Sequence, residues 1–213
     1  MLPPTTKVVS SPVSPPASRS AARSSALTPP PDATVPAPHP EAPPPGSRLG
    51  SHYHRCFGCG DDHDTGLRMH VTVGAGVSIH ARFTVTADHQ GAPGLAHGGL
   101  LSCAFDEALG SINWLLRTPS VTGRLETEFR RPVPVGTTLH ITGRCDGVAG
   151  RKIFLSAEGR LDNPEGPVAV RAAALFITVD VAHFVQHGRA EDIKAAVEHD
   201  ATRHVVRTFE VNP

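Results

Sequence analysis

The sequence is poor in several features that would point to particular classes of protein. Its 213 residues include one tryptophan, one tyrosine and four cysteines, and its 20 basic and 20 acidic residues cancel. Balanced charge provides no bulk attraction to nucleic acid or to an acidic membrane surface. No apolar run approaches the roughly 18–20 residues that span a bilayer, and the N-terminus has no signal-peptide core. The four cysteines are too few for a disulfide scaffold, so we expect a cytoplasmic protein. Because its charge is balanced, we expect no nucleic-acid partner.

The first 50 residues differ in composition from the rest of the chain. Residues 1–45 contain 14 of the 21 prolines and only five charged residues. Such a segment has too little apolar mass to offset the entropy lost on ordering. We expect a disordered leader over residues 1–50, a folded domain over residues 51–185, and a tail over residues 186–213 with a short helix. Because Arg19 and Arg23 lie among serines, a partner ligand or a targeting segment is the alternative for the leader.

Hydrophobic periodicity predicts strands around one long helix. Residues 77–87 alternate between apolar and polar side chains, as in a half-buried strand. Residues 96–116 are instead apolar around most of a helical circumference, which predicts a buried helix. Pro119 follows as a stop signal. In all, strands are predicted over residues 66–73, 77–87, 121–133, 137–148, 150–161 and 167–179.

This order of elements indicates the fold class. Strands joined by short glycine turns favour antiparallel pairing. An antiparallel sheet must bury its apolar face, and the single apolar helix is the only element of suitable length to cover it. We therefore predict an α+β hotdog fold, an antiparallel sheet wrapped around one long central helix. Other α+β sandwiches with the same element order stay open.

Two glycines begin the expected helix. Gly98 and Gly99 occupy positions where glycine is less favourable than alanine by up to about 1 kcal/mol. Without side chains, they would let a ligand approach the free N–H groups of the first turn, where the helix dipole favours negative charge. An oxyanion formed from a thioester carbonyl suits such a site. A tight loop-to-helix turn is the alternative explanation.

A carboxylate interrupts the apolar surface of the same helix. Asp106 lies between Phe105 and Glu107, and an unpaired buried carboxylate is unfavourable by several kcal/mol. It is therefore paired, functional or part of a narrow wet stripe. His97 lies about 13 Å away along the helix, too far for contact within one chain. Two such helices packed antiparallel in a homodimer would bring Asp106 of one chain to His97 and Gly98 of the other.

Several motifs together resemble a known family. His-Gly-Gly at residues 97–99 is followed, after six intervening residues, by Asp106. It is accompanied by Arg-Cys-Phe-Gly-Cys-Gly at residues 55–60, Gly-Leu-Arg at 66–68, Phe-Arg-Arg-Pro-Val-Pro-Val-Gly at 129–136 and Gly-Arg-Lys-Ile-Phe at 150–154. Each motif is weak alone. In order and over residues 52–185, they resemble the PaaI/THEM4-like branch of the hotdog thioesterases.

The resemblance implies a homodimer, or a homotetramer built from two dimers, that hydrolyses acyl-CoA without a cofactor. It implies that Asp106 is the catalytic carboxylate, as a general base on water or as the nucleophile. Gly98 would donate its N–H to the oxyanion with Gly99 assisting, and His97 would orient the thioester end. Thr122 matches a hydroxyl that positions the water or the carboxylate, although a β-branched residue starting a strand is the alternative.

The chain departs from related enzymes in one respect. Some distant hotdog thioesterases hold the attacking water with a glutamine or asparagine before the histidine. The corresponding loop here offers Gly91, with Gln90 adjacent. This departure puts the water-holding role in doubt.

Coenzyme A carries phosphates, which require local cations. Arg130, Arg131, Arg151 and Lys152 are the candidates, because the arginine fork matches phosphate geometry. Ordinary solvent-facing strand ends are the alternative.

Cys56 and Cys59 have a C-x-x-C spacing that could form a zinc site with His54 or His63. The histidine spacing is not that of a standard finger, so we predict no metal.

Two further functions stay open from the sequence. A hotdog dehydratase would act on 3-hydroxyacyl thioesters, although an aspartate nine residues after His97 does not suit the arrangement expected of it. A non-catalytic acyl-CoA-binding protein would gain nothing from the buried carboxylate of Asp106. Acyl-CoA hydrolysis is therefore the favoured hypothesis.

Overall fold

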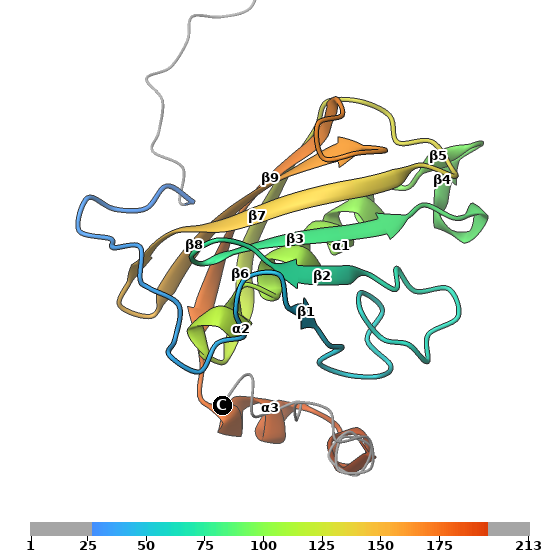
Figure 1. Cartoon of the computed structure of the whole chain (residues 1–213). Helices are drawn as coiled ribbons and strands as arrows, with labels where there is room; N and C mark the ends of the chain where they lie inside the picture. Colours follow the sequence, from blue (N-terminus) through green and yellow to red (C-terminus); the bar gives the residue numbers. More distant parts are fainter. Residues whose placement is uncertain (1–26, 196–213) are drawn as a thin grey trace, which may run out of the picture.

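The computed structural model describes residues 27–195, and its architecture is a curved antiparallel sheet around one helix (Figure 1). Within these residues the large sheet has seven strands in the order β1-β2-β3-β7-β8-β9-β6. Their bounds are Arg48–Leu49 (β1), His70–Val73 (β2), Ser78–Thr84 (β3), Ser120–Phe129 (β6), Thr138–Ala149 (β7), Lys152–Leu161 (β8) and Val168–Thr178 (β9). The hotdog prediction is confirmed.

The central helix is α1, Gly98–Gly110, and its buried face packs against the concave side of the sheet. The apolar residues of α1 and of the facing strands form one core. After two turn residues the chain continues into the short helix α2, Asn113–Leu116, which ends where Arg117 adopts a left-handed conformation with φ 48°. The single helix predicted over residues 96–116 is therefore two helices.

Strand alternation matches the prediction on the inner face. In β3 and its flanks, the apolar set is buried and the intervening side chains are exposed or half-buried. Phe154 of β8 is an exception, because it lies on the opposite face from Ile153 and Leu155 and yet is buried. It pairs with Gly147 across a bulge in β7, and a Cβ on Gly147 would lie 3.0 Å from Cβ of Ala33. Part of the outer face is therefore covered by residues 29–34.

Residues 27–49, which the sequence analysis assigns to the leader, pack against the domain. Leu27 is buried, Thr34 forms a β-bridge with Val148, and the His39 N–H donates to the Leu115 carbonyl. β1 adds an edge to the sheet beside β2. The boundary near residue 50 therefore differs from the structure, because backbone pairing supplies contacts that a proline-rich composition does not reveal. Residues 1–26 lie outside the described part.

The remaining elements flank this body. The 3-10 helix η1, Ala87–His89, leads into a small ribbon of β4, Gln90–Ala92, and β5, Leu95–Ala96. Helix α3, Val181–His187, follows β9, and the chain is helical again over residues 190–195. The short helix predicted in the tail, from about Arg189 to Glu198, lies within the described residues only as far as residue 195. Over residues 27–195 no helix is long and apolar enough to cross a membrane.

Candidate active site

Asp106 and Thr122 are in direct contact. Asp106 is half-buried on α1, and the Thr122 hydroxyl of β6 donates a 2.7 Å hydrogen bond to its Oδ1. Burial raises the pKa of Asp106, and the charge of Glu107 adds to the rise, while the bond from Thr122 opposes it. Asp106 is thus a half-buried carboxylate with a raised pKa, and the Thr122 hydroxyl is its hydrogen-bond partner.

A β-bulge aims Thr122 at the helix. The register between β6 and β9 shifts between Thr122 and Arg124, which leaves Gly123 without an opposite partner. A Cβ on Gly123 would lie 3.0 Å from Ile177, so the bulge is built with a glycine. Bulges next to active sites commonly redirect a side chain in this way. A glycine inside a strand pattern was the signal in the sequence.

The start of α1 has the geometry expected of an anion site. His97 is the N-cap, and its Nδ1 accepts a 2.9 Å hydrogen bond from the Gly99 N–H. The Gly98 N–H has no hydrogen-bond partner among residues 27–195. Of the two predicted donors, Gly99 is therefore engaged by the cap, and Gly98 is the one available to a ligand.

Within one chain, the two groups lie toward opposite ends of α1. Asp106 contacts Thr122 near the start of β6, whereas Gly98 faces Phe129 at the end of that strand. Eight residues of helix separate them by about 12 Å. A further side-chain contact, Ser102 to Thr127 at 3.0 Å, holds α1 along β6 between these points. One chain therefore does not bring Asp106 together with His97 or Gly98.

The predicted cations are divided in the same way. Arg130 and Arg131 follow the end of β6, where Arg130 pairs with Glu128 at 2.8 Å. Arg151 and Lys152 lie at the turn into β8, and Lys152 is opposite Ile177 of β9, one position from the partner of Ser120. All four are exposed. The pairs therefore lie at opposite ends of β6, so the four cations of one chain cannot converge on one phosphate group.

A cavity of about 330 Å³ adjoins Asp106. Its apolar lining comes from Trp114 of α2, Phe176 of β9 and Phe184 of α3. Phe105, which precedes Asp106, is fully buried and points the other way, toward Gly159 of β8. Hydrophobic and aromatic walls with a few polar groups are typical of small-molecule sites.

The loop before His97 leaves no space for a water-holding side chain at position 91. A Cβ on Gly91 would lie 2.8 Å from Cα of His97. The neighbouring Gln90 is exposed, with its amide donating to the Ala87 carbonyl and its Oε1 accepting from the Gly94 N–H. Gln90 thus shapes the loop.

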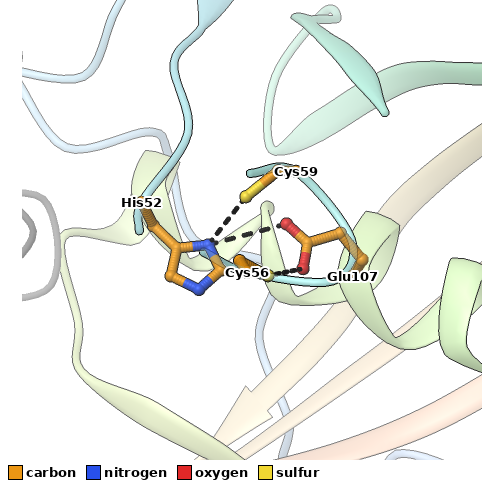
Figure 2. A group of neighbouring side chains, drawn as sticks. All are labelled: His52, Cys56, Cys59 and Glu107. Atoms are coloured by element: carbon orange, nitrogen blue, oxygen red, sulfur yellow. Dashed lines mark hydrogen bonds and ion pairs between the residues drawn. The ribbon is translucent and has the colours of Figure 1, made fainter. Parts of the chain in front are cut away.

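A second polar cluster, which the sequence analysis did not assemble, lies beside Asp106. His52, Cys56, Cys59 and Glu107 place their ligand-type atoms within 4.8 Å of one another (Figure 2). His52 Nδ1 is 3.2 Å from Cys59 Sγ and 3.6 Å from Glu107 Oε1. Cys56 Sγ is 3.3 Å from Glu107 Oε2. The C-x-x-C motif and the carboxylates of Asp106 and Glu107 were visible in the sequence. That the cysteines lie against Glu107 depends on how residues 52–60 fold onto α1.

Mutual hydrogen bonding controls ionisation in this cluster. Burial alone would lower the pKa of His52, but bonds with Cys56 and Glu107 outweigh it and raise the pKa to about 10. The bond with Cys59 lowers the pKa of Cys56 to about 5, and the same bond raises the pKa of Cys59. Burial opposes ionisation of Glu107, yet bonding to His52 lowers its pKa. The pKa values of the neighbours Asp106 and Glu107 are therefore shifted in opposite directions.

Comparison with known proteins agrees with this fold. Residues 93–168 match the model of a family described as the thioesterase superfamily. Acyl-coenzyme A thioesterase THEM4 of Bos taurus is 38% identical over 91 residues, which cover 43% of this chain and 37% of that protein. THEM4 of Xenopus laevis is 30% identical over 88 residues, covering 41% and 39% of the two chains. This chain thus matches under two fifths of the length of these relatives.

Solved structures extend the match to more of the chain. A crystal structure of a thioesterase superfamily protein aligns with TM-score 0.54 and 27% identity, covering 64% of this chain and 70% of the other. The E. coli PaaI protein aligns with TM-score 0.50 and 18% identity over 54% of this chain and 81% of its own, a likeness of fold alone. Over residues 93–168 the chain is therefore similar to the thioesterase superfamily, about 90 of its residues resemble THEM4, and its fold is the hotdog fold of these proteins.

Proposed function

We propose that this protein hydrolyses acyl-CoA to the free acid and CoA, with Asp106 as the catalytic carboxylate. The observation that carries the proposal is the placement of Asp106, half-buried, bonded to Thr122 and adjoining an aromatic-lined cavity. The curated relatives that match residues of this chain bear the name acyl-coenzyme A thioesterase, which supports the same reaction.

The chemistry requires a carboxylate and an oxyanion donor. In one route Asp106 takes a proton from the attacking water, the C–S bond breaks, and the proton passes to the departing thiolate of CoA. In the other, Asp106 attacks the thioester carbonyl, the thiolate leaves, and water hydrolyses the resulting anhydride to the free acid and Asp106. A raised pKa makes Asp106 a stronger base than an ordinary aspartate, which suits the first route. Gly98, with its unpartnered N–H at the start of α1, would donate to the oxyanion, and His97 would orient the thioester end.

A site shared between two chains reconciles the separation of these groups. In an antiparallel pair, Asp106 of one protomer would meet Gly98 and His97 of the other. β6 supports such a pair, because it ends the sheet and has no strand on its far side in the described part of the chain. Long open edges are usually covered or paired. Two pairs of cations would then contact the phosphates of CoA, Arg130 and Arg131 from one protomer and Arg151 and Lys152 from the other. Gly99 would lie beside the thioester end of the substrate.

The reaction is tested by free-thiol release from short, long and aromatic acyl-CoAs, with wild type and Asp106→Asn. The substitution preserves size and can still accept from Thr122, so a loss of about 10²-fold or more in kcat isolates the charge. Asp88→Asn, on an exposed residue of η1, is the matched control and should keep wild-type rates. Equal hydrolysis by wild type and Asp106→Asn would overturn the assignment of Asp106.

The oxyanion donor permits an unusually clean variant. Gly98 is the first residue of α1, where proline is well tolerated, and His97 before it is already extended at φ −69° and ψ 132°. A Cβ at position 98 would lie 3.5 Å from Phe129, an ordinary contact. Gly98→Pro replaces the N–H with the carbons of the proline ring and should lower kcat by about 10²-fold or more. Gly98→Ala keeps the N–H and should retain most activity.

Mixing the two defective chains tests the shared site. In mixed dimers of Asp106→Asn and Gly98→Pro, one site carries both defects and the other carries neither. With random mixing, about a quarter of wild-type activity should return. Homodimers of either variant should remain inactive. No recovery in mixed dimers would contradict a shared site while leaving the reaction itself standing.

The same substrate panel separates the other two functions. Saturable binding of acyl-CoA without thiol release would indicate a binding protein. Dehydration of a 3-hydroxyacyl-CoA without hydrolysis would indicate a dehydratase.

A further inference from the structure

The cluster next to Asp106 has the composition of a metal site. It combines two thiol sulfurs, one imidazole nitrogen and one carboxylate (Figure 2). Cys59 is buried and the other three residues are half-buried. Sulfur and imidazole ligands together in a four-membered set are the donor types that zinc prefers.

The distances fit tetrahedral coordination. Zinc bonds to nitrogen, oxygen and sulfur are about 2.0–2.3 Å long, so the ligands of a tetrahedral site lie about 3.3–3.8 Å apart. The three recorded separations are 3.2 Å for His52 to Cys59, 3.3 Å for Cys56 to Glu107 and 3.6 Å for His52 to Glu107. A metal ion at the centre thus requires little rearrangement of these side chains.

The backbone between the cysteines forms a tight turn around the sulfurs. The Gly58 N–H donates to Cys56 Sγ at 3.3 Å, and the Gly60 N–H donates to the Cys56 carbonyl at 2.8 Å. A Cβ on Gly60 would lie 2.4 Å from the His54 carbonyl oxygen. N–H donation to a ligand atom is the kind of outer-shell contact that orients metal ligands. The turn therefore presents both cysteines from a backbone that admits only glycine at this point.

The pattern of charge also calls for a cation. Glu107 has a side chain only 12% exposed, and it bonds to His52, Cys56 and Cys59. Two sulfurs and a carboxylate thus share a single imidazole. Without further positive charge, only some of these anions can ionise together in a half-buried place. A divalent ion would allow both thiols to lose their protons.

We propose that His52, Cys56, Cys59 and Glu107 bind one zinc ion. Four protein ligands close the coordination shell, so the zinc is structural and holds residues 52–60 on α1. Because Glu107 follows Asp106, and His52 and Cys56 line the cavity that Asp106 adjoins, the ion fixes one wall of that cavity. This replaces the prediction of no metal, and its ligands are His52 and Glu107 in place of His54 or His63.

The first test is the metal content of the full-length protein, measured by mass spectrometry after purification under reducing conditions. We expect about one zinc per chain in wild type and about a tenth or less in the double variant Cys56→Ser/Cys59→Ser. Cys145→Ser is the matched control, because Cys145 is a buried cysteine of β7 outside the cluster, and it should keep its zinc. This readout does not depend on hydrolysis, so its failure is distinct from failure of the proposed function.

A second measurement keeps the proposal falsifiable if the double variant does not fold. Wild type stripped with a chelator is titrated with Co²⁺, and tetrahedral thiolate coordination is read from its visible and near-ultraviolet absorption. Displacement of cobalt by one equivalent of Zn²⁺ supports the site. A wild-type protein that contains no zinc and binds neither ion, or a Cys56–Cys59 disulfide in the reduced preparation, overturns it.

Discussion

Asp106 and Glu107 are neighbouring carboxylates on α1, but their surroundings and their pKa shifts differ. Asp106 adjoins the cavity, is held by one hydroxyl from β6, and has a raised pKa. Glu107 lies among His52, Cys56 and Cys59, and its pKa is lowered. Successive residues of a helix point about 100° apart, so α1 presents each to a different neighbouring segment.

The difference teaches that the surroundings determine what a carboxylate can do. One hydrogen bond offsets only part of the burial of Asp106, so the ionised form remains reactive toward protons. Several polar partners stabilise the ionised form of Glu107, which suits it to bind a cation. The sequence pair Asp-Glu carries none of this distinction.

The largest expected effect is on stability: removing the charge of Glu107 should destabilise the fold, whereas removing the charge of Asp106 should stabilise it. Glu107→Gln should lower the free energy of unfolding at neutral pH by about 1–3 kcal/mol, because His52 keeps its charge and loses its partner. Asp106→Asn should raise the melting temperature at neutral pH, because it removes a carboxylate whose ionisation opposes folding. Both are measured by thermal unfolding with EDTA present, so that metal binding does not enter.

The pH dependence follows from the two pKa shifts. The folded pKa of Glu107 lies below its unfolded value, so its stabilisation is present above the unfolded pKa and is lost as pH falls through the folded pKa. The deficit of Glu107→Gln should therefore shrink in acid. The folded pKa of Asp106 lies above its unfolded value, so stability is lost as pH rises through it, and the gain of Asp106→Asn should appear in that direction. If stability changed with pH in the same way in Glu107→Gln and Asp106→Asn, the predicted difference between the two carboxylates would be wrong.

A smaller effect, on zinc affinity, tests the role of Glu107 through a substitution at a residue that is not a ligand. A Cβ on Gly58 would lie 2.4 Å from Glu107 Oε2 and 2.5 Å from its Cγ, so Gly58→Ala must displace the Glu107 side chain. We expect zinc affinity to fall by about 10-fold or more in a competition titration. Gly110→Ala adds a methyl group in ordinary contact, 3.7 Å from Phe176, and should leave affinity unchanged. Equal affinities in both variants would show that Glu107 does not reach the ion.

The smallest effect concerns the hydroxyl that holds Asp106. Thr122→Val keeps the shape and removes the donor, and should lower kcat by about 10-fold, the scale of one hydrogen bond to a charged group. Thr122→Ser restores the hydroxyl and should recover most of that loss. The pH–rate profile of Thr122→Val should also shift toward higher pH, because the bond that lowers the pKa of Asp106 is gone. An unchanged profile would reduce Thr122 to a packing residue.

Much of the fold was predictable because its signals are local. The alternation around Ile79 and Phe83 identified β3 and its buried face, and the apolar helix identified α1. The break after Gly110 was missed because apolar residues continue through Ile112, so composition alone does not mark it. The burial of Phe154 was missed because its cover comes from residues far away in the sequence.

The candidate site was predictable to the same degree. Gly98 and Asp106 stood out because each breaks a local rule, a glycine or a carboxylate in an apolar helix, whereas His97 came from the resemblance. The contact of Thr122 with Asp106 came from resemblance, and the bulge at Gly123 that produces it needs the register of two strands. The four cations could be named from the sequence, but their division between the two ends of β6 could not.

The sequence by itself predicted most of the elements, their buried faces and the candidate carboxylate Asp106, because periodicity and misplaced polarity are properties of neighbouring residues. Only the tertiary structure decided that a bulge in β6 turns Thr122 toward Asp106, and that His52, Cys56 and Cys59 gather on Glu107. The cluster joins segments 51 residues apart, and Thr122 lies 16 residues from Asp106. These relations are set by how a loop and a strand pack on α1, which local patterns do not encode.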